Sequence, residues 1–159
     1  MPVPRHEEAR MGQGDPNEMI SEFLTQASQL ADIEGAQGTA RLLASMQRLV
    51  RYMGSRAEWV PLPEEWAVLK DLIEIRKGRF GNRIHLAPAP RAAFFVPRMA
   101  LVGAAEELCA PDELLKDPLC EFEIEAKILQ DVAAGYVLLM TVRKTGALGQ
   151  EETERRWTL

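Results

Sequence analysis

The first residues that could do chemistry are four cations that lie close together in the sequence, Arg76, Lys77, Arg79 and Arg83. A single aromatic residue, Phe80, lies among them. Such a cluster can bind a phosphate or a nucleic acid. It can also mark the C-terminal end of a helix, where cations complement the helix dipole and pair with acidic side chains such as Glu64, Glu65 or Glu74. We favour the helix end, with Phe80 as an anchor in the core.

A second candidate is the pair of neighbouring acids Glu106 and Glu107, which could act as acid and base or hold Mg²⁺. Adjacent helical residues point about 100° apart, so we expect solvated or ion-paired side chains instead. Cys109 and Cys120 are not part of a CxxC motif, which is typical of reduced thiols in a cytosolic protein. No spacing matches a Ser-His-Asp set, a Cys-His pair, a Walker loop or a zinc site, so the sequence predicts no metal and no cofactor.

Composition limits the classes of function. The chain has 159 residues, 47% hydrophobic and 27% charged, which suits one domain or a helical unit joined to a small lobe. The net charge of −5 argues against general nucleic-acid binding, which depends on an excess of Lys and Arg. No apolar run approaches the roughly 20 residues that cross a bilayer, and the first residues lack a signal-peptide core. We therefore expect a cytoplasmic protein that binds neither nucleic acid nor membrane.

The positions of these residues depend first on a helical region over residues 15–60. After a polar tail over residues 1–14, Asp15 and Pro16 form a good helix start, and two amphipathic helices follow before Gly54 ends the second. Such a hairpin leaves apolar stripes uncovered, and a four-helix bundle in a homodimer is the usual solution. The predicted interface consists of Met19, Ile20, Phe23, Leu24, Ala27, Leu42, Met46, Leu49, Val50 and Met53.

The remaining residues predict a linking helix and a small α/β lobe. Residues 61–82 contain a helix from about Pro63 to Lys77, which glycines at 78 and 81 stop. In residues 83–159, extended runs around prolines precede a helix opened by Pro97. The segments CEFEIEAKILQ and GYVLLMTVRK then predict an antiparallel hairpin with one packed face and one wet face. The fold class is therefore α+β, with a helix on an antiparallel sheet.

Two stretches, RLVRYMG and VPLPEEWAVLKDLIEIRKGRF, keep several short motifs in a fixed order. They resemble the LytS-type sensor histidine kinases, which typically show L-R-Y, then V-x-L-x-E-E, then Y-L-x-I-x-x-x-R-F. The resemblance is strong over residues 45–84. It implies a dimerisation hairpin followed by a reduced, truncated lobe of the GHKL ATPase type. The signature residues that match are Arg51, Tyr52, Arg79 and Phe80.

The motifs that would carry the chemistry of such a kinase are altered. The family's phosphoacceptor lies in N-P-H-F-L-F-N, and the matching segment DPNEMIS has Asn17, an amide, in place of the nucleophilic imidazole. His6 and His85 lie outside this helix. Glu107 stands where the family has an Asn that helps hold Mg²⁺. Lys144 replaces the Asp that accepts a hydrogen bond from adenine, which an amine cannot accept.

The resemblance and these changes together predict a non-catalytic regulatory or scaffold protein, a pseudo-histidine-kinase. It would form a homodimer and bind a partner in two-component signalling, such as a response regulator or an active kinase. The alternative is an enzyme: a divergent active histidine kinase, a phosphotransferase or a nucleotide-binding ATPase. A third possibility is a sensor that binds a small ligand in the cavity where a nucleotide once sat.

Overall fold

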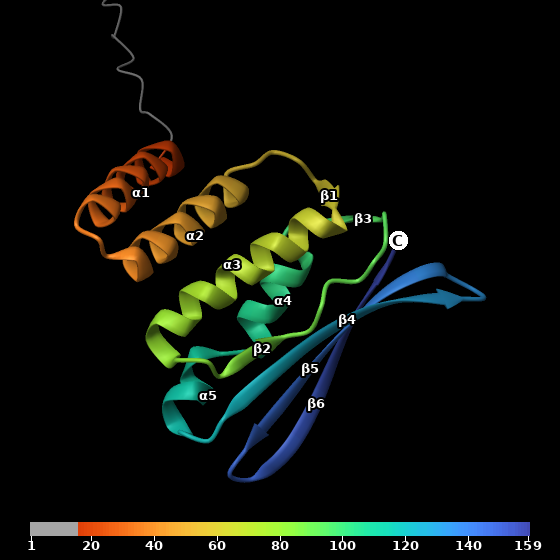
Figure 1. Cartoon of the computed structure of the whole chain (residues 1–159). Helices are drawn as coiled ribbons and strands as arrows, with labels where there is room; N and C mark the ends of the chain where they lie inside the picture. Colours follow the sequence, from red (N-terminus) through yellow and green to blue (C-terminus); the bar gives the residue numbers. More distant parts are fainter. Residues whose placement is uncertain (1–15) are drawn as a thin grey trace, which may run out of the picture.

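Three helices packed side by side form the first part of the structure. In the computed structural model, which describes residues 16–159, α1 (Pro16–Ile33) and α2 (Gln37–Met53) form a hairpin. α3 (Leu62–Phe80) packs against α2, so α1 is the outermost helix (Figure 1). The hairpin agrees with the sequence pattern, whereas the predicted tail over residues 1–14 lies outside the described residues.

The helix ends follow most of the expected signals. α1 begins at Pro16, and α2 ends directly before Gly54. α3 is longer than predicted because it continues through Gly78, and a glycine inside a helix costs only about 1 kcal/mol. It ends before Gly81, whose φ of 71° few other residues adopt.

The lobe contains two sheets and two short helices. β1 (Trp59–Pro61) pairs with β3 (Phe95–Pro97), and the main sheet has the order β2-β4-β5-β6, with all pairs antiparallel except β2 and β4. Its strands are β2 (Ile84–Leu86), β4 (Glu121–Asp131), β5 (Gly135–Gly146) and β6 (Gly149–Thr158). The helices are α4 (Ala100–Leu108) and α5 (Pro111–Lys116).

The α+β class and the β4–β5 hairpin are confirmed, while three details of the prediction are wrong. The main sheet is mixed, because β2 runs parallel to β4. α4 starts at Ala100 rather than at Pro97, which ends β3. α5 and β6 were not predicted, since α5 has only six residues and the charged β6 lacks an apolar alternation.

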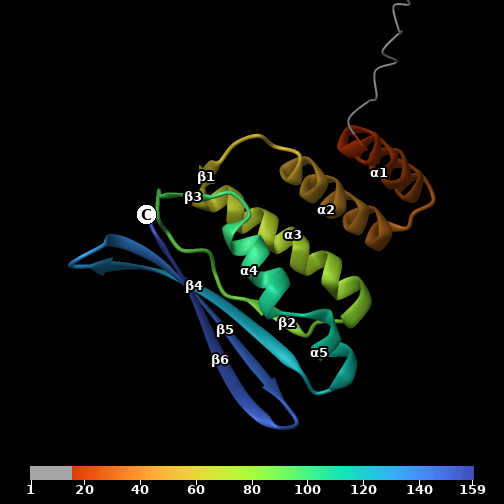
Figure 2. The same cartoon turned by 180° about the vertical axis from the view of Figure 1, so that it is seen from behind.

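The core lies between the sheet and the helices α3 and α4, which cover one face of the sheet (Figure 2). Its fully enclosed side chains come from both layers, and they include Leu62, Leu69, Leu101, Phe122, Ile124 and Met140. Phe80 is also buried, as expected of an anchor at the end of α3. The core thus fixes α4 and β5, which carry two of the altered motif residues, Glu107 and Lys144.

Candidate functional site

The inward face of α1 is polar. Arg51 donates through Nε to Ser21 Oγ at 3.2 Å, and Ser28 Oγ donates to the carbonyl oxygen of Ala40 at 3.3 Å. Gln47 also donates to the hydroxyl of Thr25. Small polar residues recur every three or four positions on this side of α1, so hydrogen bonds help to join the hairpin, beside the buried Ala31 and Ala40.

The apolar stripe of α1 consequently faces outward. Met19 is 53% exposed and Phe23 is 61% exposed, and Ile20 and Ala27 are exposed as well, while Leu24 is half-buried. Of the predicted interface residues on α2, Met53 is exposed, and the others are half-buried: Leu42, Met46, Leu49 and Val50. Leu49 differs from the rest of this set because it packs against the core of the lobe. The stripe is therefore an accessible apolar surface on the outermost helix.

Asn17, at the position that matches the phosphoacceptor, lies at the start of this helix. It lines a groove between the first turns of α1 and the end of α2, together with Glu18, Ser21, Arg51 and Gly54. Its side chain approaches Gly54 closely enough that a Cβ there would lie 3.5 Å from Nδ2. The groove is polar, and the residue that would need to be a nucleophile is a carboxamide.

Each cation of the basic cluster around Phe80 contacts a different part of the structure. Arg76 Nη2 lies 2.7 Å from Glu106 Oε1, and Lys77 Nζ lies 2.8 Å from Glu74 Oε1. The Arg79 guanidinium lies 5.0 Å from the centre of the Phe80 ring. Arg83 donates to the main-chain oxygens of Phe80, Leu114 and Asp117. The helix-end interpretation is supported, although Glu74 and Glu106 are the acidic partners rather than Glu64 and Glu65.

Glu106 and Glu107 do not act as a pair. Glu106 reaches Arg76 on α3, whereas Glu107 Oε1 lies 2.8 Å from Arg155 Nη2 on β6. Neighbouring helical residues point to different layers of the fold, as their angular separation requires. Across residues 16–159, no three His, Cys, Asp or Glu side chains gather where they could hold a metal ion.

Lys144, at the position that matches the adenine-contacting Asp, is bound to α5. Its Nζ lies 2.6 Å from Glu113 Oε2, and this hydrogen bond raises the pKa of Lys144 and lowers the pKa of Glu113. Two residues later the chain enters the tight β5–β6 turn, where Asp117 Oδ2 accepts a hydrogen bond from the amide of Ala147 at 2.8 Å. Lys144 and Glu107 therefore bind separate partners, one on α5 and the other on β6.

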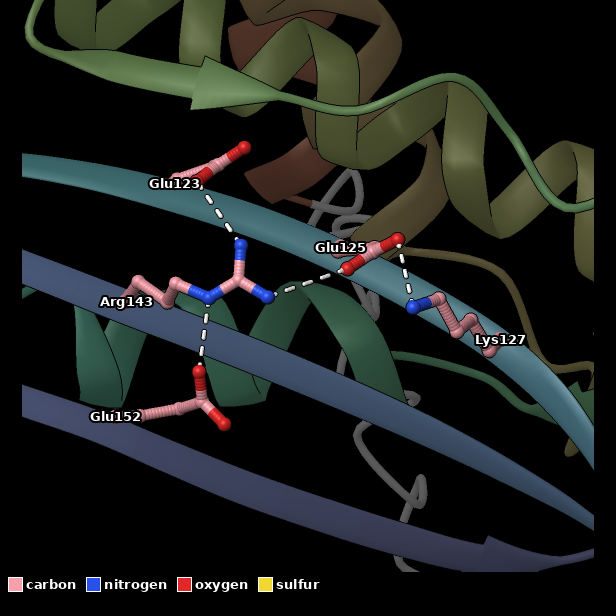
Figure 3. A network of polar contacts seen from close by, with 5 residues as sticks. All are labelled: Glu123, Glu125, Lys127, Arg143 and Glu152. Carbon is pink, nitrogen blue, oxygen red and sulfur yellow. Dashed lines mark hydrogen bonds and ion pairs between the residues drawn. The ribbon is translucent and has the colours of Figure 1, made fainter.

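The outer face of the sheet is charged and lies away from the helices. Arg143 on β5 is flanked by Glu123 on β4 at 3.2 Å and by Glu152 on β6 at 2.8 Å (Figure 3). The strand register places these three residues opposite one another. Glu125 bridges Arg143 and Lys127. This network explains the alternation in CEFEIEAKILQ and agrees with the predicted wet face.

Sequence reasoning missed the place of Glu65 in the molecule's interior. It is 0% exposed and accepts a hydrogen bond from the hydroxyl of Tyr52, a signature residue on α2. Of the three acidic partners offered for the basic cluster, Glu65 is therefore not one, whereas Glu74 pairs with Lys77. The signal was present, because residues 62, 65, 69 and 72 recur at helical spacing, which places Glu65 on the apolar stripe of α3.

None of the helices between residues 16 and 159 combines the length and the apolar composition needed to cross a bilayer. This finding agrees with the absence of a long apolar run in the sequence.

Comparison with known proteins gives one family match, and it falls on the helical part. The family model for histidine kinase matches residues 18–84, less than half of the chain. A similar solved structure is the histidine kinase domain of a blue-light-activated histidine kinase from Erythrobacter litoralis, at 12% identity and a TM-score of 0.39, covering 82% of this chain and 71% of that chain. At this TM-score the likeness does not establish a common fold. No curated protein matches the sequence. Residues 18–84 are thus histidine-kinase-like in sequence.

Proposed function

We propose that this chain is a non-catalytic regulatory or scaffold protein of bacterial two-component signalling, a pseudo-histidine-kinase of the LytS type. It dimerises through α1 and α2 and binds a signalling partner, a response regulator or an active kinase. The histidine-kinase-like sequence of residues 18–84 supports the signalling class.

The observation that carries the proposal is the pairing of Lys144 with Glu113. Adenine recognition of the kind expected from the family needs an acceptor at this position, whereas Lys144 offers only donors, one of which Glu113 engages at 2.6 Å. Glu107, in place of the Mg²⁺-binding Asn, is likewise engaged by Arg155. The residues present do not fit Mg-ATP, since the two key side chains instead fasten the lobe's helices to its sheet.

The outward apolar stripe of α1 supports the proposed dimer. Burying large side chains such as Phe23 and Met19 against a second copy would remove apolar surface from water, at about 25 cal/mol per Å² of area covered. The polar side chains on the inward face of α1 already form hydrogen bonds with α2, as Ser21 and Ser28 do. The stripe is therefore free to pack against another hairpin without any rearrangement within the monomer.

The enzyme alternative is tested by label transfer. The purified chain is incubated with Mg²⁺ and γ-labelled ATP, alone and with a candidate response regulator, beside an active histidine kinase as the positive control. We expect no label on the chain and no label passed to the regulator. Label on this chain would support a divergent kinase. In a second reaction that supplies a phosphorylated donor protein instead of ATP, label passed through this chain to the regulator would support a phosphotransferase.

A further inference from the structure

Glu65 is the most enclosed charged side chain among the described residues. It lies in the first turn of α3 and accepts hydrogen bonds from the Tyr52 hydroxyl on α2. It also accepts from the main-chain amides of Met99 at 3.1 Å, Leu101 at 2.9 Å and Val102 at 3.1 Å. A buried carboxylate is costly unless donors surround it, and here the donors come from two other helices.

The amides that Glu65 binds are those at the start of α4. This helix has no side-chain cap of its own, so its first N–H groups depend on Glu65 for their acceptor. A negative charge at this end also interacts favourably with the helix dipole. Glu65 is thus an N-terminal cap supplied from another helix, and the same carboxylate receives the hydroxyl of the hairpin residue Tyr52.

A second link connects the same two segments in the opposite direction. Arg98, directly before α4, donates through Nη1 to the main-chain oxygens of Tyr52 at 3.3 Å and Met53 at 3.2 Å, at the end of α2. Its Nε donates to the oxygen of Ala57 at 2.8 Å. Between the two links lies Met99, which among the described residues is alone in having a positive φ (68°) without being glycine. Such a conformation persists where the surroundings enforce it.

We propose that this joint, the Glu65 clasp (Tyr52, Glu65, Arg98 and the amides of Met99, Leu101 and Val102), couples the position of the hairpin to the start of α4. A movement of the end of α2 breaks the Tyr52 and Arg98 links together. Glu65 then loses a hydrogen-bond donor in a site that excludes water, and a buried acceptor without its donor is costly. Intermediate positions are therefore unfavourable, so the hairpin and α4 adopt two discrete relative arrangements rather than a continuous range. The inference rests on the proposed function in one respect, because it takes the hairpin as the docking surface.

Native-state hydrogen exchange of Tyr52→Phe tests the clasp, because this variant removes one hydroxyl and keeps the ring. Removing a hydrogen bond to a charged group should speed exchange of the Leu101 and Val102 amides about tenfold. Amides in the centre of the sheet, such as those of Ile124 and Met140, should keep their rates. The matched control is Tyr136→Phe on the exposed part of β5, which should change neither set. Unchanged rates at Leu101 and Val102, or equal acceleration throughout the sheet, would overturn the proposal.

A second comparison asks whether the hairpin reaches α4 through the clasp. Phe23→Glu is combined with Tyr52 or with Tyr52→Phe, and exchange at Leu101 and Val102 is followed beside sedimentation. We expect Phe23→Glu to alter this exchange at least threefold with Tyr52 present and to have no effect with Tyr52→Phe. An equal response in both backgrounds contradicts the clasp. If sedimentation shows a monomer in every case, the dimer in the proposed function is wrong, and the Tyr52→Phe result alone decides on the clasp.

Discussion

At the scale of single residues, neighbours of the same type have different surroundings. Glu64 is exposed, whereas Glu65 is fully enclosed by groups from three helices. The sequence shows both as the E-E of one motif, and only the phase of the helix distinguishes them. The two cysteines, in contrast, are both buried and free, which agrees with the expectation of reduced thiols.

Replacing Glu65 by Gln should cost about 2 kcal/mol of unfolding free energy, because the amide nitrogen would face the α4 donors and the charge-assisted hydrogen bonds would be lost. Glu64→Gln is the matched control and should change stability by less than about 0.5 kcal/mol. Urea denaturation measures both. Equal midpoints for the two variants would show that Glu65 is not the acceptor described here.

Cys109 should give the stability a pH dependence in the alkaline range. Burial raises the pKa of Cys109 to about 12 from its ordinary value of 9.0. Above pH 9 the unfolded chain therefore releases a proton that the folded chain keeps, so the contribution is complete below pH 9 and is lost as the pH rises toward 12. Cys109→Ala should be less stable than the wild type at pH 8. Between pH 9 and 11, however, its unfolding free energy should fall less steeply than that of the wild type, and the two slopes should differ by up to about 1.4 kcal/mol per pH unit. Identical slopes in urea unfolding would contradict this assignment.

At the scale of elements, α1 is the feature whose orientation the sequence left open. Its apolar periodicity predicts an amphipathic helix, yet periodicity cannot say whether the partner of the stripe is the same chain or another one. Hydrogen bonds such as Arg51 to Ser21 bring the polar side of α1 against α2, which leaves most of the apolar stripe exposed. The long β4–β5 hairpin was predictable, whereas the charged β6 could be placed only through its pairing with β5.

Phe23→Glu should convert the expected dimer into a folded monomer, because this side chain is 61% exposed and contributes to the stripe rather than to the core. Sedimentation at tens of micromolar, with circular dichroism for the fold, measures the effect. Leu119→Glu, at an equally exposed position outside the hairpin, is the control and should leave the dimer intact. Leu49→Glu is unsuitable, since Leu49 packs against the core. A wild-type chain that sediments as a monomer would contradict the dimer.

The β5–β6 turn should not tolerate a side chain at Gly146. A Cβ there would lie 2.6 Å from Asp117 Oδ2, and that carboxylate is restrained by the amides of Ala147 and Leu119. Gly146→Ala should therefore cost about 1–2 kcal/mol. Gly103→Ala in α4, where the added Cβ meets nothing within 4 Å, should instead stabilise the chain by about 1 kcal/mol. Thermal unfolding that ranks the two variants in the reverse order would contradict this description.

At the scale of the whole molecule, the class and order of the elements followed from periodicity, while the contacts between elements did not. The helical hairpin and the β4–β5 pair each consist of segments that are neighbours in the sequence, so their hydrophobic periodicity is enough to predict them. The Glu65 clasp joins residues up to fifty positions apart on α2, α3 and the start of α4. The ion pairs of Glu107 and Lys144 also join residues that are far apart in the sequence. Such contacts depend on how the helices stack on the sheet, and the spacing of residues in a single sequence does not predict that stacking.

The central proposal is that the lobe has lost nucleotide chemistry and that the altered residues instead form ion pairs within the chain, at its surface. Isothermal titration of the full chain with Mg-ATP tests it most directly, with an active histidine kinase titrated beside it. The structure's pairing of Lys144 with Glu113 predicts no measurable heat of binding up to about 1 mM nucleotide, which corresponds to a binding free energy weaker than about −4 kcal/mol. Saturable binding in the micromolar range would contradict the account.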